Sequence, residues 1–127
     1  MKEVMAIIQL NKMEATKDAL EVIGISSFTA YKASGRGKQK GLQIPHPTPL
    51  DERDDRDGRD ERDEKRMKYI PKRMISVVVE DEFVPAVVAV ITKVNRTGNY
   101  GDGRIFVSPM EESVRIRTGE KGSVAIS

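Results

Sequence analysis

The sequence contains no cysteine and no tryptophan, and its 127 residues include one histidine. The lack of cysteine excludes disulfides, thiolate metal sites and cysteine nucleophiles. No run approaches the roughly 18 consecutive apolar residues that cross a bilayer, and the first residues do not resemble a signal peptide. We therefore expect a soluble, cytoplasmic protein without membrane insertion, folded as one domain over residues 1–127. The single histidine, His46, stands between Pro45 and Pro47, and no role is assigned to it.

Charge is distributed unevenly along the chain. The net charge is +2, yet residues 51–66 carry nine acidic and six basic side chains, or −3, which leaves +5 elsewhere. The remaining basic residues cluster near glycines and tryptophan is absent, so small phosphates suit the chain better than nucleic acid, which is not expected as a partner. Residues 51–66 have no apolar anchor and are expected to be disordered alone. They either dock on a target protein or form a solvated insertion.

Hydrophobic periodicity predicts four strands and two helices. The first helix should follow an N-cap at Asn11 and end at Gly24, and the second should have Asp81 as its cap and Pro85 in its first turn. The order β-α-β, long loop, β-α-β predicts an α+β fold of the ferredoxin-like βαββαβ type, with both helices on one face of the sheet. The strands are expected at residues 4–10, 28–33, 74–79 and 105–108.

The opposite face of the sheet is expected to be apolar too. Residues 74–79 and 105–108 are largely apolar at consecutive positions, so both sides of these strands carry hydrophobic side chains. An exposed apolar face of this size indicates an interface, and we expect the chain to oligomerise through it.

The segment 97–104, Thr-Gly-Asn-Tyr-Gly-Asp-Gly-Arg, has the clearest chemistry. Its glycines, at 98, 101 and 103, allow a tight turn and let backbone N–H groups approach a ligand, and Arg104 follows them. An anion cradle and a simple turn are both compatible with this pattern. The spacing resembles a P-loop, but Ile105 stands where Ser or Thr would bind magnesium, and the segment enters a strand where a P-loop would open a helix.

Arginine alternates with apolar residues in the segment 114–120. On an extended chain Arg115 and Arg117 would point to the same side and could clamp a phosphate. A solvated edge strand would produce the same pattern.

Three motifs together resemble the nitrogen-regulatory PII signalling proteins: Gly-Arg-Gly-Lys-Gln-Lys-Gly at 35–41, the segment 97–107, and Val-Arg-Ile-Arg-Thr-Gly-Glu at 114–120. The resemblance implies a trimer, formed by this chain alone or as a hetero-oligomer with a PII-type paralogue. It also implies a long T-loop between the second and third strands, at about residues 37–72, and ATP or ADP in clefts between subunits.

The resemblance also implies roles for individual residues in nucleotide binding. Backbone N–H groups of Gly101, Asp102 and Gly103 would hold phosphates, and Arg104 stands where the family usually has lysine. Arg115 and Arg117 would reach the phosphates across the subunit boundary. The adenine side would be lined by Ile7, Thr29, Gly35 and Val78, and the segment with Gly37, Lys38 and Lys40 would add a basic phosphate contact at Lys38.

A second effector, 2-oxoglutarate, is implied beside ATP. The side-chain oxygen of Gln39 would help to coordinate Mg²⁺, Lys72 would pair with a carboxylate of 2-oxoglutarate, and Gly41 would mark the backbone around it. No tyrosine occupies the position at which enterobacterial members are uridylylated, so that modification is not expected.

The long loop and the motif around it look most like the regulators encoded in nitrogenase gene clusters of methanogens and some anaerobes, here the longer-loop paralogue. Such proteins bind dinitrogenase and switch off nitrogenase when 2-oxoglutarate is low. The expected function is thus a non-enzymatic nitrogen-status sensor. The alternatives are a PII protein with another target, such as an ammonium transporter or a biosynthetic enzyme, a phosphohydrolase that uses the same cradle, and a nucleic-acid binder.

Overall fold

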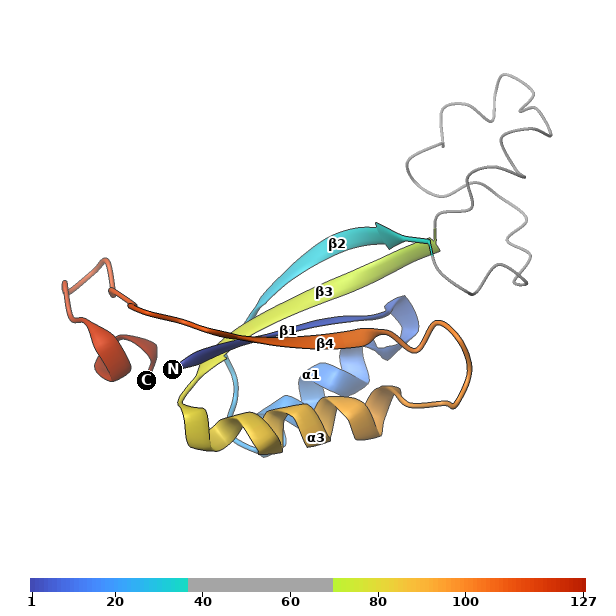
Figure 1. Ribbon diagram of the computed structural model, residues 1–127, viewed down its shortest axis with the longest axis horizontal. Helices are drawn as coiled ribbons and strands as arrows, with labels where there is room; N and C mark the ends of the chain where they lie inside the picture. Colours follow the sequence, from blue (N-terminus) through green and yellow to red (C-terminus); the bar gives the residue numbers. More distant parts are fainter. Residues whose placement is uncertain (37–69) are drawn as a thin grey trace, which may run out of the picture.

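A computed structural model describes residues 1–36 and 70–127 (Figure 1). The sheet contains β1 (Lys2–Gln9), β2 (Thr29–Gly35), β3 (Ile70–Val79) and β4 (Arg104–Pro109). Two α-helices connect them, α1 (Met13–Val22) and α3 (Val84–Asn95), and short 3₁₀ helices lie at Leu10–Lys12, Asp81–Phe83 and Gly122–Ile126. None of the helices in the described residues is long and apolar enough to span a membrane.

The sheet is antiparallel throughout, in the order β2-β3-β1-β4. Figure 1 shows α1 and α3 side by side on one face of it. This arrangement confirms the predicted α+β fold of ferredoxin-like type. β3 begins earlier than expected, so that Lys72 belongs to a strand of the sheet.

The core lies between the sheet and the two helices. Alternate residues of each central strand face the helices, as the two-residue period of a strand requires. The buried hydrophobic residues are Val4, Ala6, Ile8, Leu20, Ile75, Val77, Val79, Val87 and Ile91. Thr16 and Asn95 are buried with them and join α1 to α3, because Asn95 Nδ2 donates a hydrogen bond of 3.0 Å to Thr16 Oγ1.

The other face of the sheet is not covered by the described residues. Cross-strand partners share a face, so the register places Ile7, Met74, Tyr31 and Phe106 on this side. Tyr31 is 46% exposed and Phe106 is 49% exposed. The same register also places Glu3, Ser76 and Arg104 on this face, so it is only partly apolar. Oligomerisation through it stays a prediction.

Both predicted helix caps are wrong. α1 begins at Met13 and makes no side-chain cap hydrogen bond, so Asn11 is not its N-cap. Asp81 lies in a 3₁₀ turn before α3, and its Oδ1 instead accepts a hydrogen bond of 2.8 Å from the amine of Met1. This hydrogen bond from the amine holds the pKa of Asp81 below its ordinary value. Pro85 does lie in the first turn of α3, as expected.

Candidate functional site

Three glycines shape the connection from α3 to β4, which we call the glycine loop (residues 97–103). Gly98, Gly101 and Gly103 have φ angles of 91°, 98° and 115°, a region that residues with side chains rarely adopt. At Gly103 a side chain is also excluded by packing, because a Cβ would lie 1.9 Å from the carbonyl oxygen of Ile7. The loop therefore meets β1 backbone to backbone, and the expectation that it leads into a strand is confirmed.

Asp102 closes the glycine loop from within. Its Oδ2 accepts hydrogen bonds from the backbone N–H groups of Thr97 at 2.7 Å and Gly98 at 2.9 Å, and its Oδ1 accepts one from the Thr97 hydroxyl at 2.5 Å. The Thr97 hydroxyl is the main cause that holds the pKa of this carboxyl below its ordinary value. Asp102 is thus an ionised acceptor that organises the loop.

The carbonyl of Gly101 is held from the sheet by two side chains. Lys72 Nζ donates to it at 2.8 Å and Gln9 Nε2 at 3.0 Å. The two donors are cross-strand partners, one at the end of β1 and the other near the start of β3. Lys72 is only 7% exposed, and desolvation by burial lowers its pKa, against the opposing effect of nearby Asp102. An ammonium group is therefore held in a largely buried position beside the loop.

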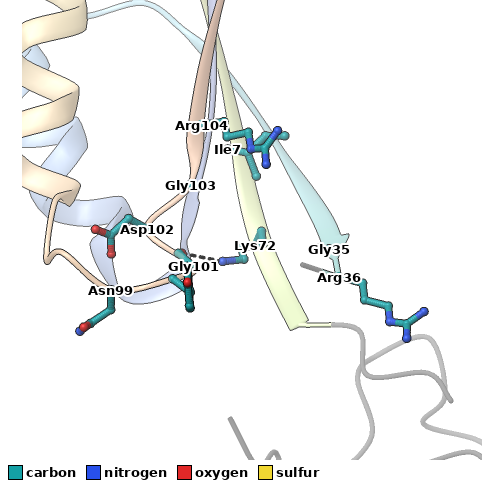
Figure 2. Close-up of a pocket in the computed structure, with 10 residues that line it drawn as sticks. Ile7, Gly35, Arg36, Lys72, Asn99, Gly101, Asp102, Gly103 and Arg104 are labelled. Carbon is teal, nitrogen blue, oxygen red and sulfur yellow. Dashed lines mark hydrogen bonds between the residues drawn. The ribbon is translucent and has the colours of Figure 1, made fainter. Parts of the chain in front are cut away.

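A cavity of about 530 Å³ lies beside the glycine loop, and we call it the loop cavity. This volume falls within the roughly 300–1,000 Å³ typical of small-molecule sites. Figure 2 shows Lys72 reaching the Gly101 carbonyl from β3, with Ile7 and Arg104 on one side and Gly35 and Arg36 on the other. The lining residues are Ile7, Gly35, Arg36, Lys72, Asn99, Tyr100, Gly101, Asp102, Gly103 and Arg104. Three of them carry positive charge, which makes the cavity suitable for an anion.

Seven of the residues singled out in the sequence meet at the loop cavity: Ile7, Gly35, Lys72, Gly101, Asp102, Gly103 and Arg104. Gly37, Lys38, Gln39, Lys40 and Gly41 lie outside the described residues, as do His46 and the charged run. The sequence analysis did not include Arg36, Asn99 and Tyr100, which line the cavity, or Gln9, which contacts the loop, among the site residues. The first three are neighbours of predicted residues and could have been included, whereas Gln9 is found only from the strand register.

Thr29 and Val78 do not line the loop cavity. Val78 lies eight residues after the start of β3, where it pairs with Glu3 towards the opposite end of the sheet from Lys72. Thr29 is the first residue of β2. Val78 instead lines a second cavity of about 460 Å³, together with residues of the turn after α1 and of the C-terminal 3₁₀ helix. At about 3.3 Å per residue, the eight residues of β1 separate the two ends of the sheet by over roughly 20 Å.

The expectation that residues 114–120 are extended is wrong. Gly119, with a φ of 78°, lets the chain reverse, and its N–H donates to the carbonyl of Arg115 at 2.7 Å. Arg115 forms an ion pair of 2.6 Å with Glu120 and donates to the carbonyl oxygen of Ser127 at 3.0 Å. Arg117 is exposed on the turn. Ser127 lines the second cavity, so Arg115 lies close to that cavity. Figure 1 shows the C-terminal segment and the connection from α3 to β4 at opposite ends of the sheet.

Comparison with known proteins gives the following matches. The family model for nitrogen regulatory protein P-II matches residues 1–120. A protein of Methanothermococcus thermolithotrophicus described as nitrogen fixation nifHD region GlnB-like protein 2 is 49% identical over 126 residues, which are 99% of this chain and 98% of that protein. A protein of the same description from Methanothermobacter marburgensis is 47% identical over 128 residues, which cover 99% of this chain and 100% of that protein. Nitrogen regulatory protein P-II of Azospirillum brasilense is 41% identical over 126 residues, which cover 99% of this chain and 100% of that protein.

Proposed function

This chain belongs to the nitrogen regulatory protein P-II family, and we propose that it is a cytoplasmic, non-enzymatic sensor that binds ATP or ADP in the loop cavity. The family assignment drawn from the sequence motifs is confirmed, including the likeness to nifHD-region proteins of methanogens. One observation carries the proposal for the ligand: a glycine loop, Arg36, Arg104 and Lys72 converge on one cavity of suitable size.

The loop cavity offers the two kinds of group that bind phosphate well. The N–H groups proposed for phosphate are those of Gly101, Asp102 and Gly103, which line the cavity, and two of these residues have no side chain to block the approach. Arg36 and Arg104 line the same cavity and can each donate two parallel hydrogen bonds to phosphate oxygens. Arg104 keeps the charge of the lysine usual in the family and changes the geometry of the contact.

We propose that a second copy completes the nucleotide site. Arg115 and Val78, both expected at the nucleotide, lie at the opposite end of the sheet from the glycine loop within one chain. A head-to-tail contact would bring that end of one copy against the loop cavity of the next. Heterologous contacts of this kind close into a ring when the rotation between copies closes, and the proposed ring is a trimer, of this chain alone or with a paralogue.

The second proposed ligand is 2-oxoglutarate, bound next to Mg-ATP. Lys72 is the cation proposed for one of its carboxylates, and its place on the wall of the loop cavity supports this. Mg²⁺ in nucleotide sites keeps several waters and takes phosphate oxygens, so it needs few protein ligands. The proposed protein ligand is Gln39.

The proposed target is nitrogenase, through its dinitrogenase component. The support is that the relatives from Methanothermococcus thermolithotrophicus and Methanothermobacter marburgensis are described as nifHD-region GlnB-like proteins. Another target, such as an ammonium transporter or a nitrogen-assimilation enzyme, is the second candidate, since the Azospirillum relative is described only as a nitrogen regulatory protein. Affinity capture from nitrogen-fixing cells, with and without 2-oxoglutarate, separates the two.

Isothermal titration of the full chain tests the ligand proposal. We expect ATP to bind, and Mg-ATP to strengthen the binding of 2-oxoglutarate. Arg104→Met should weaken ATP binding about ten-fold or more, because a charged hydrogen bond to phosphate is lost. The matched control is Arg96→Met, since Arg96 is exposed and outside the lining of the loop cavity. Equal ATP affinity in both variants, or no ATP binding by the parent chain, would contradict the proposal.

A further inference from the structure

Two donors from adjacent strands converge on one carbonyl oxygen of the glycine loop. Gln9 Nε2 lies 3.0 Å and Lys72 Nζ 2.8 Å from the Gly101 oxygen, although these residues are 92 and 29 positions from it in the sequence. A carbonyl oxygen has two lone pairs and can accept both hydrogen bonds at once. The sheet thus holds the loop by two independent attachments.

These attachments set the direction of a backbone donor. The described residues contain no cis peptide bond, so the carbonyl of Gly101 and the N–H of Asp102 point in opposite directions within one peptide plane. Gly101, at a φ of 98°, imposes little restriction of its own on this plane. The orientation of the N–H group of Asp102, a residue that lines the loop cavity, therefore depends on the donors that hold the Gly101 carbonyl.

The two donors differ in how they respond to an anion. Lys72 is buried, and burial lowers its pKa against the opposing effect of Asp102, so a second carboxylate beside it would further favour the charged ammonium form. A carboxylate is also a stronger partner for an ammonium group than a neutral carbonyl is. Gln9 has a neutral amide, and a carboxylate exerts no comparable pull on it.

We propose that Gln9 is a positioning residue that keeps the Gly101 carbonyl in place when Lys72 turns to a carboxylate ligand, and that it thereby carries part of the coupling between a dicarboxylate and the nucleotide. This inference rests on the proposed function, because it assumes that phosphates bind the glycine loop and that a carboxylate binds Lys72. With both donors in place, either one holds the carbonyl. Once the dicarboxylate has taken Lys72, the amide of Gln9 is the remaining donor of the pair.

The test uses full-length Gln9→Met, which keeps the length of the side chain and loses the donor. Binding of ATP alone should change by less than about two-fold, because Lys72 still holds the carbonyl. The factor by which 2-oxoglutarate strengthens binding of Mg-ATP should fall about five-fold, the equivalent of one hydrogen bond. Coupling between two ligands is reciprocal, so the factor by which Mg-ATP strengthens 2-oxoglutarate binding should fall equally.

Gln9→Asn is a second variant, to be used if Gln9→Met does not fold. The asparagine side chain is one methylene shorter, so its amide cannot reach the Gly101 oxygen that Gln9 Nε2 contacts at 3.0 Å, and it should show the same loss of coupling. Asn11→Leu is the matched control, because it removes an exposed amide two residues away that does not line the loop cavity. Unchanged coupling in the Gln9 variants, or an equal loss of ATP binding with and without 2-oxoglutarate, overturns the role of Gln9 alone. Failure of the parent chain to bind ATP overturns the proposed function along with it.

Discussion

Replacement of Gly103 separates a packing requirement from backbone strain. Gly103 has a φ of 115° and immediately precedes β4. A Cβ at this position would lie 1.9 Å from the carbonyl oxygen of Ile7 and 3.0 Å from its carbonyl carbon. Both atoms belong to the backbone of β1, which cannot rotate away as a side chain can. Gly103→Ala therefore requires the start of β4 to move away from β1.

The size of the effect follows from that movement. The contact must lengthen by about 1.1 Å to reach 3.0 Å, the lower limit for real Cβ contacts. Such a shift weakens the pairing of Arg104 with Ile7, at about 1 kcal/mol for a hydrogen bond, and residual overlap costs about 1–3 kcal/mol. Strain at positive φ costs about 1–2 kcal/mol, offset by about 0.4–1 kcal/mol from the restricted unfolded chain. The free energy of unfolding should fall by about 3 kcal/mol.

Gly98→Ala is the matched control. Gly98 has a φ of 91°, but a Cβ there meets no atom within 4 Å, so the substitution introduces strain without a clash. It should lower the free energy of unfolding by about 1 kcal/mol or less. Urea unfolding of both variants measures the difference, provided that the slopes with denaturant agree. Equal destabilisation by the two substitutions would refute the reasoning, because the contact with Ile7 would then contribute nothing.

Two further substitutions test the hydrogen bonds of the loop and of the helix pair. The pKa of Asp102 is depressed in the folded chain, chiefly by the Thr97 hydroxyl, so its stabilisation is present above the ordinary pKa of about 3.9 and is lost as the pH falls through the lower folded value. The free energy of unfolding of the parent should therefore exceed that of Asp102→Asn by the full amount at pH 7, and the excess should shrink below about pH 4. An excess that is equal at pH 7 and pH 3 contradicts this. Thr16→Val removes one of the two acceptors of the buried Asn95 amide, the Thr16 hydroxyl at 3.0 Å, and leaves the Ile91 carbonyl at 2.9 Å. The free energy of unfolding should fall by about 1 kcal/mol, the net contribution of one hydrogen bond. An unchanged midpoint in urea would show that this hydrogen bond contributes no net stability.

The strands and the glycine loop were predictable because they depend on local sequence patterns. The four strands lie where apolar residues cluster, and their bounds differ from expectation by at most a few residues. The glycine loop turns at positions with positive φ, which favour glycine. Glycines at these positions can be recognised from the sequence of a single chain.

Predictions failed where another interaction outweighs the local sequence pattern, and a contact was missed where it joins distant parts of the chain. Asp81 has the sequence position of a helix cap, but the Met1 amine is a charged donor and takes its carboxylate. Arg115 fits an alternating strand, but the positive φ of Gly119 and the ion pair with Glu120 favour a turn. The contact of Gln9 with Gly101 spans 92 positions, and only the pairing of β1 with β3 and β4 brings the two together.

The hydrogen bonds that close the glycine loop also bear on the phosphohydrolase hypothesis. In that hypothesis Asp102 would be the general base, since it is the acidic side chain among the described residues that line the loop cavity. A general base works best when its pKa is near the working pH. The hydrogen bonds from Thr97 and Gly98 that close the loop lower the pKa of Asp102 and occupy both of its oxygens. The contacts that shape this cradle thus weaken its carboxylate as a base, which favours a site that holds phosphates as a signal over one that transfers them.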